Sequence, residues 1–438
     1  MRSILVSITA LFAGLCLLLM GNSLLSTLLV IRGINEHFSE QFLGFLTSSY
    51  YLGALLGTWL AGRMIRQMGH IRCFTFCASL LACGTLLYGL LLSPTIWLVI
   101  RLFTGFGVFV MFTVIESWLN GQTPDEYRNR IFSIYMLVQM LATAAAQQWL
   151  NLDSAESFTL FAVAAACASA AVMPVSWTRL QQPHIALDMP QMNIMKLFDA
   201  APVAATAVVI SGLVLGPFWG LTPLFASSLG YSESQLAAYI SITVVGAAFI
   251  QYPVGRASDF FDRRKVVLVV LLSAICTAVA MAFAGYLLPE ERWLMTLLSM
   301  LFCGLTLAVY PIGVAHLVDR IHKDHLVAGS SGLLLLYGLG SFIGPSLAGF
   351  GLQQLGGKAL PMFYVVAILC AVIYLSWQLR KSKVVEVPDE YETHFVAMAR
   401  TSPNVLPMHP DSEDELEVPG EHRSASPEQD QQETTPVE

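Results

Sequence analysis

The chain has 438 residues, of which 55% are hydrophobic and only 12% are charged. The charged share is about half that of an ordinary soluble domain, so the composition argues against a cytosolic enzyme and indicates a membrane protein. The formal net charge of -7 is unexpected for such a protein, because its cytoplasmic loops should be rich in Lys and Arg.

Apolar runs long enough to cross a bilayer, which takes about 20 helical residues, follow one another along the chain. The first run is too long for the roughly 7–15-residue apolar region of a cleaved signal peptide, so we expect it to remain as a span. Short connections leave no room for a soluble domain between the runs. The twelve predicted spans are 4–31, 42–61, 73–93, 95–119, 131–150, 158–176, 203–227, 236–254, 266–288, 293–317, 328–352 and 361–379.

The two halves of the chain show a weak internal repeat. Gly21-x5-Thr27 recurs as Gly216-x5-Thr222, and three other short matches have nearly the same offset. Each half holds six spans, an even number, so the halves share one orientation and form a parallel repeat about an axis along the membrane normal. The predicted fold is all-α, with six-helix bundles at 1–177 and 203–379 and a cytoplasmic linker at 178–202.

Lys and Arg are distributed unevenly among the predicted loops. With the N-terminus inside, seventeen lie on the inner side and three on the outer side, namely Arg32, Arg292 and Lys358. The positive-inside rule then places both termini in the cytoplasm. Residues 380–438 hold 14 acidic and 5 basic residues, and their seven prolines and lack of apolar periodicity predict a disordered acidic tail. The negative net charge therefore belongs to the tail and not to the membrane body.

Two polar turns follow corresponding spans of the two halves, one within 62–72 and the other within 255–265. Glycines there allow close approach of helices, Asp259 can cap a helix or pair with an Arg, and the basic cluster can stay at the lipid headgroups. A simple positive-inside anchor is the alternative interpretation. The turn residues of interest are Gly62, Arg66, Gly69, Gly255, Arg256, Asp259, Arg263 and Arg264.

These features together resemble the major facilitator superfamily of secondary transporters. The turn at 255–265 is similar to its signature Gly-x3-Asp-Arg-x-Gly-Arg-Arg, and the Arg101–Gly107 stretch is similar to a second signature, an Arg followed by glycines. Several runs resemble the bacterial YcaD-like branch more closely, and the likeness covers about residues 5–380. These runs are 114–117, 251–256, 310–312 and 326–345.

The resemblance implies transport by alternating access, with spans 1, 4, 7 and 10 lining a central cavity. It also implies that a turn acid locks the outward-facing state; Asp259 holds that place, whereas the first turn has Arg66. The Gly-Pro pair that antiporters often carry in span 5 is replaced by Ala146-Gln147, which argues against a drug antiporter.

Ionisable residues within the spans are few, and each such residue is costly in a bilayer unless it serves a function. Arg101 could attract an anionic substrate or bind backbone carbonyls, or it could extend to the outer headgroups. Glu116 could be a protonation site or part of an inner gate, or a helix-end carboxylate paired with Arg128 or Arg130. His316 could meet Glu116 across the two halves when the inner side closes, or it could be an interfacial residue.

Uncharged polar and aromatic side chains complete the predicted midplane site, although helix packing is the alternative role for each of them. Gly216-Pro217 and Tyr310-Pro311 are predicted to interrupt spans 7 and 10, which would free backbone groups for substrate. The candidate substrate-binding residues are Asn22, Thr27, Arg101, Gln139, Trp219, Thr222, Tyr310 and Tyr337.

No phosphate-binding loop, catalytic elbow, metal-ligand spacing or basic nucleic-acid patch occurs in the sequence. We therefore expect a non-enzyme without cofactor or metal: a bacterial inner-membrane transporter of a small molecule, driven by protons or another gradient and acting as a monomer. The alternatives are a sensor or a scaffold on the same fold, each signalling through the acidic tail. Substrate, coupling ion and direction of transport stay open.

Overall fold

A computed structural model describes residues 2–123, 127–177, 197–198, 200–320 and 326–381, and within these ranges it contains helices and no strand. Each predicted span corresponds to one long helix, except that the sixth is divided in two. The helices are α1 (Arg2–Asn35), α2 (Glu40–Met68), α3 (His70–Leu90), α4 (Pro94–Gln122), α5 (Arg128–Gln147), α6 (Phe158–Ala170), α7 (Val172–Trp177), α9 (Pro202–Ser228), α10 (Glu233–Phe260), α11 (Arg263–Leu287), α12 (Arg292–Val318), α13 (Leu326–Leu355) and α14 (Leu360–Lys381), with short 3-10 turns η2 (Gln148–Asn151) and η4 (Gly357–Ala359).

Ten helical segments of the described part are long and apolar enough to cross a membrane. The less apolar α2 and α5 pack among them and complete the set of twelve. The twelve-helix architecture predicted from the sequence is therefore confirmed. The predicted linker lies almost wholly outside the described residues, as does nearly all of the predicted tail.

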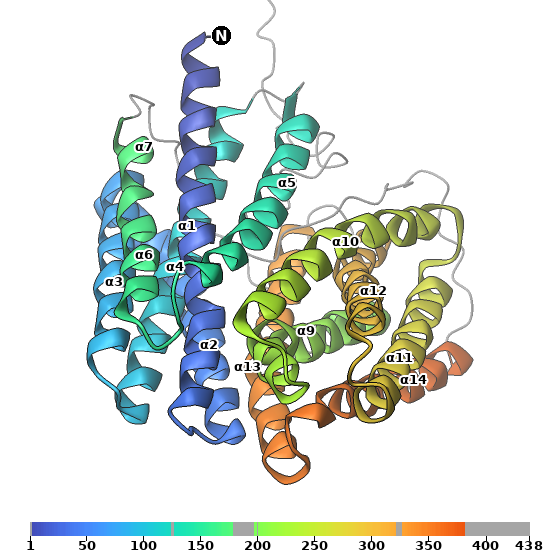
Figure 1. The fold of residues 1–438 in the computed structure, drawn as a ribbon. Helices are drawn as coiled ribbons and strands as arrows, with labels where there is room; N and C mark the ends of the chain where they lie inside the picture. Colours follow the sequence, from blue (N-terminus) through green and yellow to red (C-terminus); the bar gives the residue numbers. More distant parts are fainter. Residues whose placement is uncertain (1, 124–126, 178–196, 199, 321–325, 382–438) are drawn as a thin grey trace, which may run out of the picture.

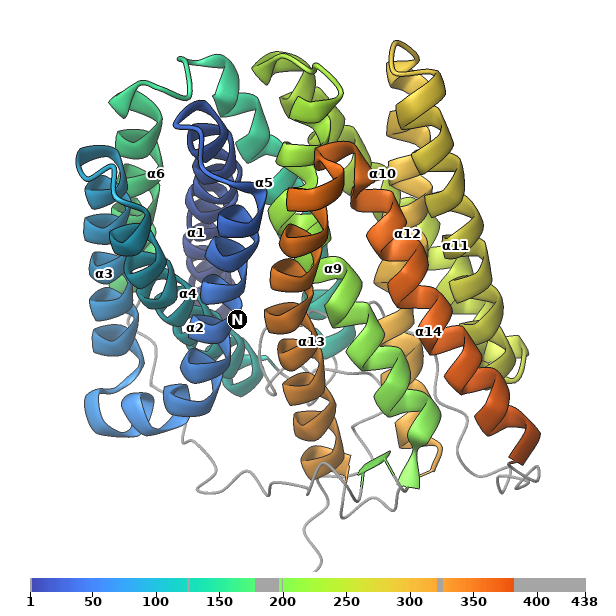
Figure 2. The same ribbon diagram turned by 90° about the horizontal axis from the view of Figure 1, so that it is seen from below.

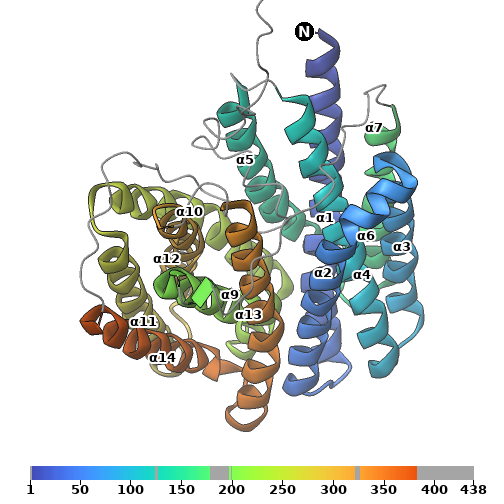
Figure 3. The same cartoon turned by 180° about the vertical axis from the view of Figure 1, so that it is seen from behind.

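The helices form two groups, α1–α7 and α9–α14, which we call the N bundle and the C bundle (Figure 1). Helices α2 and α13 lie side by side where the groups meet, and the view from behind shows the same neighbours (Figure 3). Helices α5 and α10 form a second contact between the bundles. The space between the two groups is therefore bordered by helices from both halves of the sequence.

Glycines bring helices into backbone contact within each bundle. A Cβ atom on Gly105 of α4 would lie 2.1 Å from the Tyr50 carbonyl oxygen of α2, and one on Gly340 of α13 would lie 2.4 Å from the Val209 carbonyl oxygen of α9. Such short separations exclude any larger side chain, so these glycines set the spacing of the helix pairs. The glycine after the arginine in the span 4 signature thus has a packing role.

Several hydrogen bonds between the bundles lie toward the end with the α1–α2 turn. Ser346 donates to Ser48 at 2.7 Å, and the Ala155 N–H donates to the Glu233 carboxylate at 3.2 and 3.3 Å. Backbone also meets backbone there, since a Cβ on Gly44 would lie 2.4 Å from the Pro345 carbonyl oxygen. We call this set of contacts the seam; Figure 2 shows α13 of the seam beside α9 within the C bundle.

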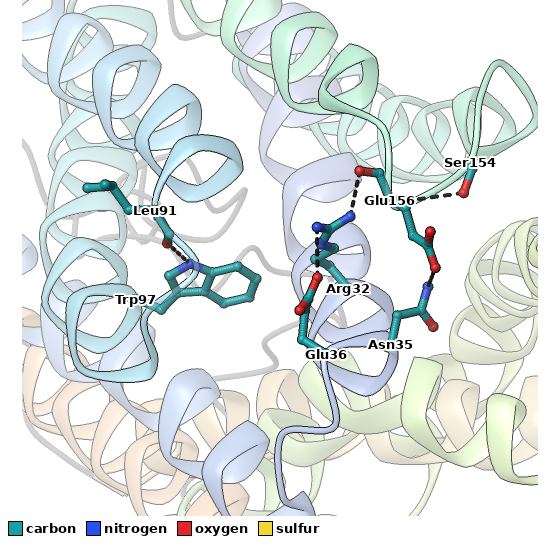
Figure 4. Close-up of polar contacts among 7 residues, drawn as sticks. All are labelled: Arg32, Asn35, Glu36, Leu91, Trp97, Ser154 and Glu156. Atoms are coloured by element: carbon teal, nitrogen blue, oxygen red, sulfur yellow. Dashed lines mark hydrogen bonds and ion pairs between the residues drawn. The ribbon is translucent and has the colours of Figure 1, made fainter.

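The same end of the N bundle is tied by its own polar contacts (Figure 4). Arg32 at the end of α1 binds the Glu36 carboxylate at 2.7 Å and donates to the Glu156 backbone oxygen at 2.5 Å. The indole N–H of Trp97 donates to the Leu91 carbonyl oxygen at 2.7 Å, which closes the turn from α3 to α4. These contacts connect the loops at this end of the N bundle to its helices.

Two sequence expectations about helix continuity need correction. Helix α9 runs without a break through Pro217 and Pro223, and α12 runs through Pro311, so the predicted interruptions of spans 7 and 10 are absent. Helix α10 likewise extends to Phe260 and α11 begins at Arg263, so only Phe261 and Asp262 of the predicted 255–265 turn lie outside helices. Packing against neighbouring helices keeps these segments helical, as proline in membrane helices permits.

Candidate functional site

A cavity of about 250 Å³ lies between the two bundles. Its wall comes from α1, α2, α4 and α5 on one side and from α9, α10, α12 and α13 on the other. Seven of the eight candidate substrate-binding residues are part of this wall: Asn22, Thr27, Arg101, Gln139, Trp219, Thr222 and Tyr337. The eighth, Tyr310, is outside the wall; its ring stands edge-on to that of Tyr337, with centroids 5.3 Å apart.

The most polar part of the wall belongs to the N bundle and consists of Asn22, Ser26, Tyr50 and Arg101, which we call the Arg101 cluster. The Arg101 guanidinium lies over the Tyr50 ring at 4.3 Å from its centroid, and Nη2 donates to the Ser26 hydroxyl at 3.0 Å. The Asn22 amide donates to the Tyr50 hydroxyl at 3.2 Å. Arg101 is only 5% exposed, so it does not extend to the headgroups.

Further polar side chains line the cavity near the Arg101 cluster. Thr27 of α1 donates to the side-chain oxygen of Gln147 of α5 at 2.9 Å. Gln139 Nε2 and Thr243 Oγ1 are buried and make no hydrogen bond to any described residue. Thr222 instead donates to the Phe218 carbonyl oxygen of its own helix. The wall therefore has unused hydrogen-bonding capacity on both bundles.

Sequence reasoning missed several wall residues because they lie on spans 2, 5 and 8, which the family resemblance did not place at the cavity. Tyr50 is the most important of them, since it contacts both Asn22 and Arg101. The only sequence signal was the sparseness of large polar side chains within these apolar spans. The missed polar residues include Thr47, Tyr50, Tyr51, Gln147, Thr243 and Gln251.

Glu116 and His316, the candidate coupling residues, lie on α4 and α12 in different bundles. Glu116 is fully buried and accepts a hydrogen bond from the Tyr135 hydroxyl of α5. His316 is 5% exposed, and its Nε2 has no partner among the described residues. The two side chains are therefore not paired in this conformation, and neither is part of the cavity wall.

The two polar turns differ in how they are built. Gly69 joins α2 to α3 with φ of 79°, a left-handed conformation that glycine adopts readily. In the second turn Asp262, not Asp259, caps α11 by accepting from the Arg264 backbone N–H at 3.0 Å. Arg263 pairs with Asp319 at 3.2 Å, so the basic turn is tied to the end of α12.

Comparison with known protein families assigns this fold and its central cavity to one superfamily. The profile of the Major Facilitator Superfamily matches residues 11–191 and 204–410. The chain belongs to this superfamily and is a multi-pass membrane protein of a transporter family. The superfamily assignment predicted from the sequence is confirmed.

A related protein and two solved structures agree with the superfamily assignment. An uncharacterised transporter of this superfamily from Escherichia fergusonii, YcaD, is 29% identical over 375 residues, which are 85% of this chain and 95% of that protein. A variant of the nucleoside transporter NupG has a similar fold, with a TM-score of 0.72 and 13% identity over 85% of this chain and 99% of that one. A D-xylose–proton symporter reaches 0.61 and 12% identity over 90% and 99% of the two chains. At these identities the two structures bear on the fold alone.

Proposed function

We propose that this protein is a secondary active transporter that moves a small molecule across the bacterial inner membrane by alternating access, with both termini in the cytoplasm. One observation carries the proposal: polar side chains from both bundles line the same cavity between them. A site shared by two bodies is exposed to one side or the other as the bodies rock. Secondary transporters place their substrate sites at this position between repeats.

The position of the seam indicates the side of the membrane to which the cavity opens. Contacts between the bundles gather toward the end with the α1–α2 turn, which the proposed topology places outside the cell. The cavity would then exchange with the cytoplasm, and transport would require the seam to open. The conformation described here is therefore inward-facing.

We further propose that transport is coupled to protons through Glu116. A fully buried carboxylate with a Tyr135 hydroxyl as partner can take up a proton when its surroundings change. The similar fold of a D-xylose–proton symporter supports this proposal. His316 would approach Glu116 when the inner side closes.

Reconstituted proteoliposomes test these proposals. We expect uptake of compounds from a metabolite pool to depend on an imposed pH gradient, and Glu116→Gln to abolish that dependence. A matched control is Glu290→Gln, because Glu290 is exposed and is part of neither the cavity wall nor the contacts that define the seam. A pH-dependent flux that is unchanged in Glu116→Gln would refute the coupling role.

Deleting residues 384–438 separates a transporter from the alternatives. A transporter should retain flux without the acidic tail, because the cavity is built wholly from residues 19–337. A sensor or a scaffold that signals through the tail should lose its function. Loss of flux in a deletion variant that folds normally would contradict the transport proposal.

A further inference from the structure

Arg101 carries a positive charge inside the membrane body without an acidic partner. Its side-chain contacts among the described residues include the Ser26 hydroxyl, the Tyr50 ring and the buried Tyr88 hydroxyl, all uncharged. Nη1 is buried and makes no hydrogen bond there. Neutral groups solvate a guanidinium but do not cancel its charge, so the site retains a strong preference for an anion.

The remainder of the cavity wall does not supply that anion. Among the described lining residues there is no aspartate or glutamate, and Arg101 is the one permanently charged side chain. The opposite wall is aromatic and hydroxylated, with Trp219, Phe218 and Thr222 from α9. Gln139 and Thr243 each hold a buried polar atom without a partner in the described structure. One cation thus faces an uncharged, partly apolar surface.

From this asymmetry we infer that the substrate is a small organic anion with one carboxylate and an uncharged, partly apolar body. The inference rests on the proposed function and adds the substrate class to it. The carboxylate binds at the Arg101 cluster, with Ser26 and Asn22 as neighbouring hydrogen-bonding groups. The body contacts the α9 wall, and the cavity of about 250 Å³ limits it to the size of a small metabolite.

Tyr50 is the specificity residue in this site. Its ring holds the guanidinium from one side, and its hydroxyl is held by Asn22, so the cation is fixed before the substrate arrives. Tyr50→Phe keeps the ring and loses only the bond to Asn22, whereas Tyr50→Leu loses the cation–π contact as well. Carboxylate binding should therefore weaken severalfold in Tyr50→Phe and at least tenfold in Tyr50→Leu.

The test compares paired probes that differ only in charge: 4-hydroxybenzoate with 4-hydroxybenzamide, hexanoate with hexanamide, and lactate with lactamide. Binding is measured as the rise in thermal unfolding midpoint of the full-length protein in detergent, with sodium chloride as the salt control. We expect at least one carboxylate to stabilise the protein at concentrations at least tenfold below its amide. Arg101→Gln should abolish that preference, and Arg101→Lys should retain part of it.

Arg292→Gln is the matched control, because Arg292 also lies over a tyrosine ring, at 5.4 Å from the centroid of Tyr231, but outside the cavity. It should leave the preference unchanged. Stabilisation by no carboxylate of the panel, equal stabilisation by an amide, or a preference that survives Arg101→Gln would each overturn the inference. If Arg101→Gln does not fold, the comparison of each carboxylate with its amide in the wild-type protein, together with the Tyr50→Leu variant, still tests the anion site.

Flux measured in proteoliposomes distinguishes this inference from the proposed function. Transport of neutral compounds without any carboxylate would uphold transport and overturn the substrate class. Selective binding of a carboxylate that never crosses the membrane would uphold the anion site and refute transport.

Discussion

The hydroxyl group of Ser241 on α10 joins the two bundles, and its removal tests how much such hydrogen bonds stabilise their contact. Its hydroxyl accepts from Gln148 Nε2 at 2.8 Å and donates to the Ala144 carbonyl oxygen at 2.7 Å. Both partners belong to the N bundle, so a single side chain makes two hydrogen bonds between the bundles. Ser241→Ala removes both bonds and leaves the helices otherwise intact.

The expected magnitude follows from those two bonds. A hydrogen bond between neutral groups contributes about 1 kcal/mol, so the loss is at most about 2 kcal/mol. Gln148 keeps a weaker contact with the Ala237 carbonyl oxygen at 3.4 Å, and its side chain is exposed enough for water to replace part of the loss. We therefore expect a change of about 1 kcal/mol, which shifts the ratio of open to closed seam about fivefold.

Double electron–electron resonance gives the distribution of distances between two spin labels and hence the ratio of open to closed seam. Spin labels at Thr95 and Glu290, both exposed at the seam end of their bundles, are introduced into a chain whose eight native cysteines have been replaced. Ser241→Ala should enrich the longer distances about fivefold. Thr277→Ala is the control, because the Thr277 hydroxyl bonds to Ser273 of its own helix at 2.8 Å.

An unchanged distance distribution in Ser241→Ala would refute the assignment of the seam as the closed gate. An equal shift in Thr277→Ala would show that loss of any buried hydroxyl loosens the protein, and it would refute the magnitude reasoning.

Two further predictions concern stability. Gly105→Ala should lower the free energy of unfolding by about 1–3 kcal/mol, because its Cβ would meet the Tyr50 carbonyl oxygen at 2.1 Å. Gly351→Ala, with nothing within 4 Å, should show no loss, and equal midpoints in thermal unfolding would contradict the packing argument. Partial burial opposes ionisation of Asp262, but hydrogen bonds from Arg264 outweigh it and hold the pKa of Asp262 below its ordinary value. The charge therefore stabilises the fold above about pH 4 and ceases to do so as the pH falls further. Asp262→Ala should cost about 1 kcal/mol at neutral pH and less at about pH 3; a pH-independent cost in unfolding measurements would count against this role.

The sequence predicted the helices well because each apolar run must remain helical inside a bilayer. It was less accurate at the helix ends, where polar residues continue a helix into water; α10 extends six residues beyond the predicted end at 254. Proline led to a wrong prediction for span 7, because α13 packs against α9 and supports it through Pro217. These outcomes depend on contacts between helices that are distant in sequence.

Span number and polarity together predicted part of the cavity wall, and polarity alone pointed to Gln139 on span 5 and Tyr337 on span 11. Asn22 and Trp219 lie on spans 1 and 7 and are part of the wall, whereas Tyr310 on span 10 lies behind Tyr337. Tyr50 could not be singled out, because span 2 was not expected at the cavity and Tyr50 stands beside Tyr51 without a motif. The direction of each side chain depends on helix rotation, which a single sequence does not determine.

The seam between Gly44 and Gly349 joins two backbones with no side chains between them, since a Cβ on Gly44 would lie 2.9 Å from the Gly349 Cα. Interlocked side chains must change rotamer before two helices can rotate against each other, whereas smooth backbone surfaces need no such change. If the bundles rock as proposed, the barrier at this point would be set by the few polar contacts around it. The glycines at this contact are not part of the cavity wall, so under the proposed mechanism the residues that recognise the substrate could change without altering the surface on which the bundles rotate.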